Sequence, residues 1–470
     1  MALFENLSAH TSSIAVVNES GSLITYDELA STADLIAEFT PERNLIFSFC
    51  QNKFECLAGY VGFLRGDCVQ LLLQPDVDNL LLLNLIQTYK PKYLFAPISY
   101  FSKLPKGKIL WKGADYQLLQ INNLVDYEMH QDLALLMTTS GTTGSTKLVR
   151  LTYENIRSNA VAIINYLQIR STDRAITTMP MSYVYGLSIL NTHLLAGASL
   201  VITESTLVER NFWNLLQSTR TTTFGGVPYL YTVLEKLRFE QMVLPSLRVL
   251  TQAGGKLNLE LRKKFFAVCQ EKGIQLILMY GQTEATGRIA YIPWDKREIY
   301  RGTVGVAIPG GRLTLEDENG KEVTSAHQAG ELIYRGPNVS MGYAENRGDL
   351  IKGDCNRGML KTGDVAKLSS NGSFSIIGRK SRIIKIHGAR VNLDELEELL
   401  LSQKIECACI GVDDALQVFL KTPFVEKRAA TILFDRVRIR PASCQFRQVE
   451  EIPRGQSGKT LYSRLHELGS

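Results

Sequence analysis

The residues best placed to do chemistry lie in a run rich in hydroxyl side chains, residues 138–147. An apolar stretch precedes this run at 133–137, and a segment with a helical pattern begins near Thr152. Because glycine lets backbone N–H groups approach an anion closely, the pattern indicates a turn that binds phosphate. The spacing of Gly141 and Gly144 differs from that of the Walker A loop, G-x-x-x-x-G-K-[ST]. A solvated linker would have a similar composition.

The same run resembles the phosphate loop of the adenylate-forming enzymes, a family that includes acyl-CoA synthetases, adenylation domains of peptide synthetases, and luciferases. The family pattern is [ST]-[ST]-G-[ST]-T-G-x-P-K, and this chain has Thr146 in place of the proline. The resemblance implies that ATP is bound here by Thr139, Ser140, Gly141, Thr142, Thr143, Gly144 and Lys147.

A second motif, Y-G-Q-T-E at 280–284, resembles the Y-G-x-T-E motif of the same family. The resemblance implies that Tyr280, Gly281 and Gln282 hold adenine and that Thr283 binds a phosphate oxygen. Thr283 and Glu284 would then be catalytic residues, and Glu284 a ligand of Mg²⁺, a cation that prefers oxygen ligands and is held largely by waters and phosphates. Considered alone, a glutamate after a strand is more often a surface charge or a cap.

Two further motifs concern the ribose and a hinge. The sequence K-T-G-D at 361–364 resembles the family's T-G-D motif, in which the two oxygens of the aspartate, here Asp364, accept hydrogen bonds from both ribose hydroxyls. Gly-Asp is also ordinary turn chemistry. Residues 378–385 resemble the hinge motif, which implies that Arg379 reaches the ribose or a phosphate. The hinge position itself holds Ser381 where the family has Asp or Lys.

The fifth motif, residues 453–459, resembles the terminal P-x-x-x-x-G-K motif, whose lysine is the catalytic cation of the family. A flexible ammonium can bridge the attacking carboxylate and the α-phosphate, so Lys459 would offset charge in the transition state. Without the resemblance, a lysine in a tail rich in Gly and Ser would be a solvated residue. The five motifs follow the family order, which implies activation of a carboxylic acid by MgATP as an acyl-adenylate, with release of pyrophosphate.

The choice of acid is predicted from residues 180–187. Family members that activate α-amino acids have an aspartate here, whereas this chain has Val184 and no acidic residue between 180 and 198. An unpaired ammonium in a buried pocket would cost several kcal/mol, so an acyl or aryl acid is favoured. Tyr183 replaces the histidine of the acyl- and aryl-activating pattern. The residues expected either to line the pocket or to belong to the core are Tyr183, Tyr185, Val227 and Pro228.

The acceptor is harder to predict. Residues 388–397 resemble carrier-protein-loading domains more than many acyl-CoA synthetases, so a phosphopantetheine thiol is expected, with acyl carrier protein slightly favoured over CoA. Residues 412–439 match the family poorly, which leaves an amine or hydroxyl acceptor as an alternative. A non-catalytic scaffold that binds nucleotide is a third hypothesis, and retention of the charged motif residues argues against it.

The elements that must position these motifs alternate between strands and helices up to about residue 300, which predicts parallel sheets covered on both faces. Turns at the carboxyl ends of such strands form nucleotide sites, and Gly254 and Gly255 lie in one of them. The expected fold class is α/β. An N-terminal domain, 1–379, would hold two doubly wound αβα sheets and a small β-barrel at about 300–378. A mobile α+β lid would follow at 380–470.

Composition limits the functional classes. Hydrophobic residues make up 45% and charged residues 21% of the 470 residues, as in ordinary globular proteins. The net charge of +5 is small for this length and gives no reason to expect nucleic acid binding. The eight cysteines include no C-x-x-C pair, and neither an export signal nor a membrane-spanning run is evident. A cytoplasmic enzyme is therefore expected.

Overall fold

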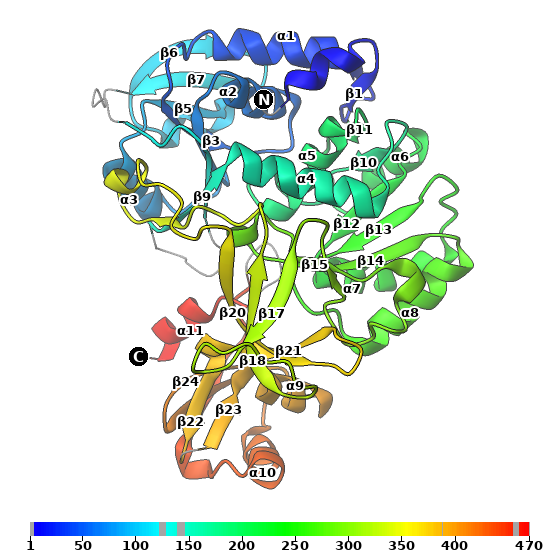
Figure 1. The fold of residues 1–470 in the computed structure, drawn as a ribbon, viewed down its shortest axis with the longest axis vertical. Coiled ribbons are helices and arrows are strands. Elements are labelled where there is room, and N and C mark those ends of the chain that lie inside the picture. The colour runs from blue at the N-terminus through cyan, green and yellow to red at the C-terminus, as the bar shows by residue number, and fades with distance from the viewer. Residues whose placement is uncertain (1–3, 122–127, 139–145, 388, 455–459, 470) are drawn as a thin grey trace.

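Residues 4–121, 128–138, 146–387, 389–454 and 460–469 are described by a computed structural model. Figure 1 shows the last part of the chain at the end of the molecule farthest from helix α1 (Tyr26–Ala37). Within these ranges, no helix combines the length and the apolar character that crossing a membrane requires.

In the described part of the chain, the larger of two main sheets has nine strands. They are β1 (Ile14–Val17), β2 (Leu23–Thr25), β10 (Arg174–Ile176), β11 (Ser199–Val201), β12 (Thr223–Gly226), β13 (Val249–Gln252), β14 (Gln275–Tyr280), β15 (Ala290–Tyr291) and β16 (Val306–Ala307). The order is β16-β15-β14-β13-β12-β10-β11-β1-β2. Neighbours from β14 to β1 pair in parallel, and antiparallel pairs extend the sheet at both edges. The expected parallel arrangement is confirmed.

The second main sheet is formed by eight described strands in the order β19-β9-β8-β4-β3-β5-β7-β6. They are β3 (Leu45–Phe49), β4 (Val69–Leu73), β5 (Tyr93–Pro97), β6 (Gly107–Lys112), β7 (Tyr116–Ile121), β8 (Leu133–Thr138), β9 (Leu148–Thr152) and β19 (Tyr343–Ala344). Strands β5, β3, β4 and β8 are parallel, and all five residues of β3 and of β4 are buried. Burial on both faces explains why these strands are continuous apolar runs.

Helices form three layers around the two sheets (Figure 1). They are α2 (Phe54–Arg65), α3 (Asn79–Tyr89), α4 (Tyr153–Leu167), α5 (Val184–Leu195), α6 (Arg210–Ser218), α7 (Pro228–Lys236) and α8 (Leu259–Glu271). One apolar core joins α1, α2, α4 and α5 to the facing sides of both sheets. A second core packs α6, α7 and α8 on the outer face of the nine-stranded sheet, and a third packs α3 on the other sheet. This is the doubly wound arrangement that the sequence predicts.

Local signals in the sequence place the ends of several elements correctly. Two short apolar runs around the turn 19–22 predict a hairpin at residues 14–25, and β1 and β2 do pair antiparallel there. Thr25 followed three residues later by Glu28 predicts a capping box, and α1 begins with it: Thr25 accepts from the backbone of Glu28, and the Glu28 side chain accepts from the backbone of Thr25. Helix α4 has an equivalent box made by Thr152 and Asn155.

The hydroxyl-rich run does not lead directly from a strand into a helix. It follows β8 and precedes β9, and these two strands pair antiparallel before α4 begins. The sequence analysis did not anticipate β9. A strand of five residues next to a helix is difficult to recognise, because its apolar residues also fit the helical pattern that follows.

The third sheet consists, among the described residues, of β17 (Arg312–Glu316), β18 (Ala329–Arg335), β20 (Met359–Leu368) and β21 (Phe374–Arg379) in that order. All three pairings are antiparallel. A small barrel was expected here, but the described strands form an open sheet with β17 and β21 at its edges. Four strands give too little circumference for closure around a filled interior.

The C-terminal residues form an α+β unit with its own apolar core. It contains β22 (Ile383–Ile386), β23 (Ala389–Asn392), α9 (Leu393–Ser402), β24 (Cys407–Val412), β25 (Ala415–Leu420), α10 (Glu426–Val437), β26 (Cys444–Gln448) and α11 (Tyr462–Gly469). Strand β21 ends at Arg379, where the sequence predicts the domain boundary, and the 3₁₀ turn η7 (Lys380–Arg382) follows directly. Residues 412–439, which match the family pattern poorly, nevertheless form β25 and α10.

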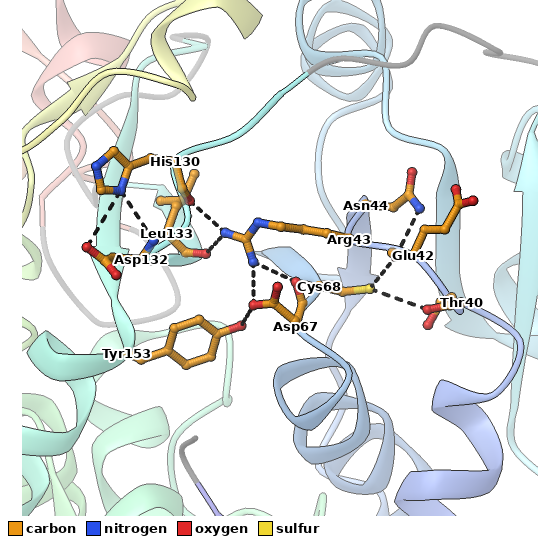
Figure 2. Close-up of polar contacts among 10 residues, drawn as sticks. All are labelled: Thr40, Glu42, Arg43, Asn44, Asp67, Cys68, His130, Asp132, Leu133 and Tyr153. Carbon is orange, nitrogen blue, oxygen red and sulfur yellow. Dashed lines mark hydrogen bonds and ion pairs between the residues drawn. The ribbon is translucent and has the colours of Figure 1, made fainter. Parts of the chain in front are cut away.

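A polar cluster around Arg43 ties the eight-stranded sheet to its neighbouring helices (Figure 2). The guanidinium donates to the backbone oxygens of His130 at 2.7 Å and Leu133 at 2.6 Å, and to Asp67 Oδ1 at 2.6 Å. The Tyr153 hydroxyl donates to the same Asp67 oxygen at 3.2 Å. One side chain therefore connects the start of β8, the turn before β4 and the start of α4.

Replacing Arg43 with methionine should lower the free energy of unfolding by about 2–4 kcal/mol, because the backbone oxygens of His130, Leu133 and Asp67 each lose a hydrogen bond from a charged donor. The ion pair adds little to this value, because the Asp67 side chain is 62% exposed. The midpoint of thermal unfolding measures the effect. Lys92 is the matched control, since its partner Glu42 is 74% exposed and its replacement by methionine should hardly move the midpoint. Equal midpoints for both variants would contradict the structural role of Arg43.

Candidate active site

Three parallel strands end side by side at one edge of the nine-stranded sheet. The strands β12, β13 and β14 are neighbours and end at Gly226, Gln252 and Tyr280. The turns that follow them hold Gly254, Gly255 and the Y-G-Q-T-E motif. The carboxyl ends of parallel strands are where open α/β sheets bind their ligands, so the fold gathers these motifs where a ligand is expected.

The predicted ribose residues contact one another and the predicted adenine residue. Asp364 on β20 lies opposite Arg379 on β21 in the strand register, and Arg379 Nε is 2.9 Å from Asp364 Oδ1. The Tyr280 hydroxyl donates a hydrogen bond to the other oxygen of Asp364, Oδ2. Burial raises the pKa of Tyr280, and the neighbouring charge of Asp364 raises it further, so the tyrosine remains a donor. Each carboxylate oxygen has two lone pairs and can accept a second hydrogen bond.

A second cluster lies around Tyr343 on β19. The ammonium of Lys147 is 4.1 Å from the centre of the Tyr343 ring and 3.3 Å from Glu345 Oε1. The Tyr343 hydroxyl donates to Glu284 Oε1 at 2.8 Å. Burial raises the pKa of Tyr343, and the Glu284 carboxylate adds to this shift. Neither Tyr343 nor Glu345 belongs to one of the five motifs, so no local signal in the sequence marks them as site residues.

Arg150 explains how β19 reaches this position. Its side chain is fully buried and donates to the backbone oxygens of Met341 at 2.9 Å and Asp349 at 3.0 Å. These bonds hold the segment that carries Tyr343 against β9, where Tyr343 pairs with Val149. Lys147 precedes β9 directly, so strand pairing brings the lysine to the ring.

The residues present fit a magnesium ion held mainly by a bound phosphate. Glu284 supplies a carboxylate that accepts from Tyr343, whose ring Lys147 covers, whereas no cluster of three or more His, Cys, Asp or Glu side chains suited to a metal occurs in the described ranges. The described side chains alone therefore do not form a complete set of ligands for the ion. One or two carboxylates combined with substrate phosphates are the usual donor set for Mg²⁺.

The predicted pocket residues gather beside the turn after β13. A Cβ atom on Gly254, whose φ is +82°, would lie 2.8 Å from Tyr183 Oη and 3.0 Å from Val227 Cγ1. A Cβ on Gly255 would lie 3.2 Å from Pro228 Cγ. Only glycine allows this close approach of the turn to the side chains.

Tyr185 lies deeper than Tyr183, and their ring centres are 6.4 Å apart. Its hydroxyl is 2.8 Å from both oxygens of Thr251, the backbone carbonyl and the side-chain Oγ1. Burial raises the pKa of Tyr185 to about 12, so the phenol stays neutral. Tyr185 therefore belongs both to the core and to the wall of a cavity.

The remaining predicted site residues lie in or next to two 3₁₀ turns, or outside the described residues. Thr283 begins the 3₁₀ turn η4 (Thr283–Ala285), and a Cβ on Gly281 would collide with the backbone oxygen of Gly287 at 2.3 Å. Gln282 precedes this turn, and Ser381 is exposed within η7. The predictions for residues 139–144 and for Lys459 lie outside the described residues.

This architecture, two doubly wound sheets with a small antiparallel sheet and a C-terminal α+β unit, defines the adenylate-forming class of folds. ATP-bound MatB from Rhodopseudomonas palustris has it, with a TM-score of 0.78 at 21% identity over 100% of this chain and 99% of that chain. The o-succinylbenzoate CoA synthetase of Bacillus subtilis, in complex with the acyl-adenylate intermediate OSB-AMP, gives a TM-score of 0.76 at 20% identity over 96% and 95%.

The sequence itself identifies the family. The model of the AMP-binding enzyme family matches residues 3–344, so the chain belongs to that family. A 2-succinylbenzoate–CoA ligase of one Bacillus cereus strain is 30% identical over 447 residues, 87% of this chain and 90% of that protein. A ligase of the same description from a second strain is 26% identical over 481 residues, covering 93% and 96%. The family predicted from the five motifs is confirmed.

Proposed function

We propose that this protein uses ATP to activate a carboxylic acid as an acyl-adenylate, releasing pyrophosphate, and then transfers the acyl group to the thiol of CoA. The observation that carries the proposal is the pair of clusters at the strand ends. Tyr280, Asp364 and Arg379 form a group suited to a nucleoside, and Glu284 and Lys147 meet at Tyr343 in a group suited to phosphates.

In the first step, a carboxylate oxygen of the acid forms a bond to the α-phosphorus of ATP. The bond from that phosphorus to the bridging oxygen breaks, and its electron pair leaves with pyrophosphate. Asp364 would hold the ribose hydroxyls, and the phosphates would replace Glu345 as the partner of Lys147. Since the step depends on alignment and on neutralising charge, fixed cations and hydrogen bonds supply most of the catalysis.

The other roles follow from the motifs. Residues 139–144 would enclose the phosphates, Tyr280 and the turn formed by Gly281 and Gln282 would bind adenine, and Thr283 would bind a phosphate oxygen. Glu284 would hold Mg²⁺, which when bound supplies positive charge to the phosphate oxygens. Lys459 would bridge the carboxylate and the α-phosphate.

An aryl acid is the best candidate for the substrate. The helix that forms one pocket wall has Val184 where an ammonium group would need a carboxylate, so α-amino acids are disfavoured. Both relatives named above are 2-succinylbenzoate–CoA ligases. Tyr183, Val227 and Pro228 offer apolar and aromatic surface beside Gly254 and Gly255, which suits a planar ring.

CoA is a better candidate for the acceptor than the carrier protein that the sequence analysis slightly favoured. The names of the relatives specify CoA. Residues 412–439, which match the family pattern poorly, also form regular structure, with β25 and α10 packed around a continuous core. This removes the main reason for preferring an amine or hydroxyl acceptor. In the second step, the thiolate sulfur would bond to the acyl carbon, and AMP would leave with the electron pair.

We place the domain boundary at residue 379 and the hinge at Ser381. Lys256, after β13, pairs with Glu398 on α9 at 2.8 Å, and both side chains are mostly exposed. Exposed ion pairs contribute little, so this contact would not prevent the unit 380–470 from moving as a lid between the two steps. The free state of all eight cysteines supports a reducing compartment such as the cytoplasm.

ATP–pyrophosphate exchange tests the first step. We expect exchange with aryl acids such as 2-succinylbenzoate and little with α-amino acids. Incubation of the productive acid with CoA, holo-carrier protein or simple amines then tests the acceptor, and an acyl-CoA product is expected. Exchange driven by an α-amino acid would overturn the assignment of the acid, and a product formed only on the carrier protein would overturn the assignment of CoA.

A further inference from the structure

A small cavity lies between α4, α5 and the nine-stranded sheet, with a volume of about 20 Å³. Its wall includes the polar side chains of Tyr185, Ser188, His193, Thr251 and Arg288. A cavity of this size holds a small polar group or a water rather than a long acyl chain. The combination of polar wall and small volume indicates a polar occupant.

Arg288 is the feature of this cavity that most needs explanation. It is 2% exposed, and no carboxylate within the described ranges forms an ion pair with it. Its Nη1 donates to the backbone oxygen of Gly287 at 2.7 Å and its Nη2 to Ser188 Oγ at 3.1 Å, while the buried Nε has no partner among described atoms. The guanidinium carbon lies 4.3 Å from the centre of the Tyr185 ring.

These partners do not neutralise the charge. The Tyr166 hydroxyl is a further neutral partner of Arg288. Arginine keeps its proton in proteins, so burying it away from water and from any anion costs more free energy than one ring contact and these neutral partners return. His193, in the same wall, is neutral because burial lowers its pKa to about 4. Its buried Nε2 also has no partner among described atoms. Arg288 is therefore the only cation in the described wall of the cavity.

A continuous path of side chains connects Arg288 to the strand ends. Gly254, in the turn after β13, approaches Tyr183, whose ring lies next to Tyr185, and the Tyr185 ring lies against Arg288. An acid that presents one carboxylate to the nucleotide at the turn would thus extend along the two tyrosines toward the guanidinium.

We propose that Arg288 binds a second anionic group of the substrate, and that the enzyme therefore prefers acids with two carboxylates. This inference rests on the proposed function, because it assigns the acid that the same site activates. The planar guanidinium has N–H groups left for a carboxylate, which it can bind with two parallel hydrogen bonds. The first carboxylate reacts with ATP, and the second remains unchanged beside Arg288.

Matched pairs of acids test the proposal by ATP–pyrophosphate exchange. 2-Succinylbenzoate is compared with 2-butyrylbenzoate, and glutarate with pentanoate, because each pair differs by a terminal carboxylate in place of a methyl group. For the wild type, kcat/KM of the better diacid should exceed that of its partner by about 100-fold, the usual scale for a buried charge that loses its partner. In Arg288→Gln this ratio should fall to near one, and in Arg288→Lys it should recover in part.

Arg297 is the matched control, since its guanidinium also stacks on an aromatic ring, 4.1 Å from the centre of Trp294, but away from the cavity. Arg297→Gln should keep the wild-type ratio. A wild type that uses both members of each pair equally would overturn the inference, as would an Arg288→Gln variant that loses both acids in the same proportion.

A failure of the proposed function can be distinguished from a failure of the anion site at Arg288. If no acid supports exchange, the diacids are tested for thermal stabilisation of the ATP-free protein. A rise in the unfolding midpoint with a diacid, present in the wild type and in Arg297→Gln but lost in Arg288→Gln, would support the anion site. An equal midpoint with and without the diacid in the wild type would overturn it.

Discussion

Replacement of Lys459 with alanine should lower the rate of ATP–pyrophosphate exchange by about 100- to 1,000-fold, the range found when one group that stabilises transition-state charge is removed. Negative charge gathers on the carboxylate and the α-phosphate as they approach, and in our proposal the Lys459 ammonium offsets it. Arg454 and Thr460 form an isolated β-bridge and α11 follows at Tyr462, so described backbone contacts hold this part of the chain in place. The loss should therefore appear in kcat, with unchanged thermal stability.

Lys427 on α10 provides the control for this variant. It is exposed and lies in the same C-terminal unit, so Lys427→Ala changes the charge by the same amount without touching the motif. Its exchange rate should equal that of the wild type. Near-normal exchange by Lys459→Ala would show that another cation serves the transition state.

Replacement of Asp364 with asparagine should lower kcat/KM for ATP by about 1,000-fold, because two hydrogen bonds from the ribose to a charged acceptor are weakened at once. Asp364 is 3% exposed and already holds Arg379 and Tyr280, so the change also loosens the neighbouring groups of the site. The measurement is exchange at varied ATP concentration.

Comparison with 2′,3′-dideoxy-ATP separates the ribose contact from a structural role. The wild type should prefer ATP strongly over the dideoxy nucleotide, and Asp364→Asn should accept both with similar kcat/KM. If the variant loses the same factor for both nucleotides and keeps the wild-type preference, Asp364 holds the sheet together but does not bind ribose. The thermal midpoint reports how much of the loss comes from the broken pair with Arg379.

The parts of this protein that sequence predicts well depend on residues close together in the chain. The apolar run 69–73 predicts a strand, and the T-x-x-E pattern at 25–28 predicts a capping box; both lie at the positions that the structure gives them, because burial pattern and capping act within a few residues. The open third sheet was harder to predict, since alternation and turns specify strands but do not specify whether the edge strands meet.

The candidate active site likewise combines features that short segments of sequence predict with features that they do not predict. The five motifs by themselves identify the family, and they predict the nucleotide and the residues that bind it, since each motif is a short contiguous segment with fixed chemistry. Tyr343, Glu345 and Arg288 carry no such local signal. Their importance arises only when β19 pairs with β9 and when α5 packs on the sheet, which brings Tyr343 to Glu284 and Arg288 to Tyr185. Tyr343 and Glu284 are 59 positions apart in the chain. A contact over such a separation depends on how whole strands and helices pack, and only the tertiary structure decides that packing.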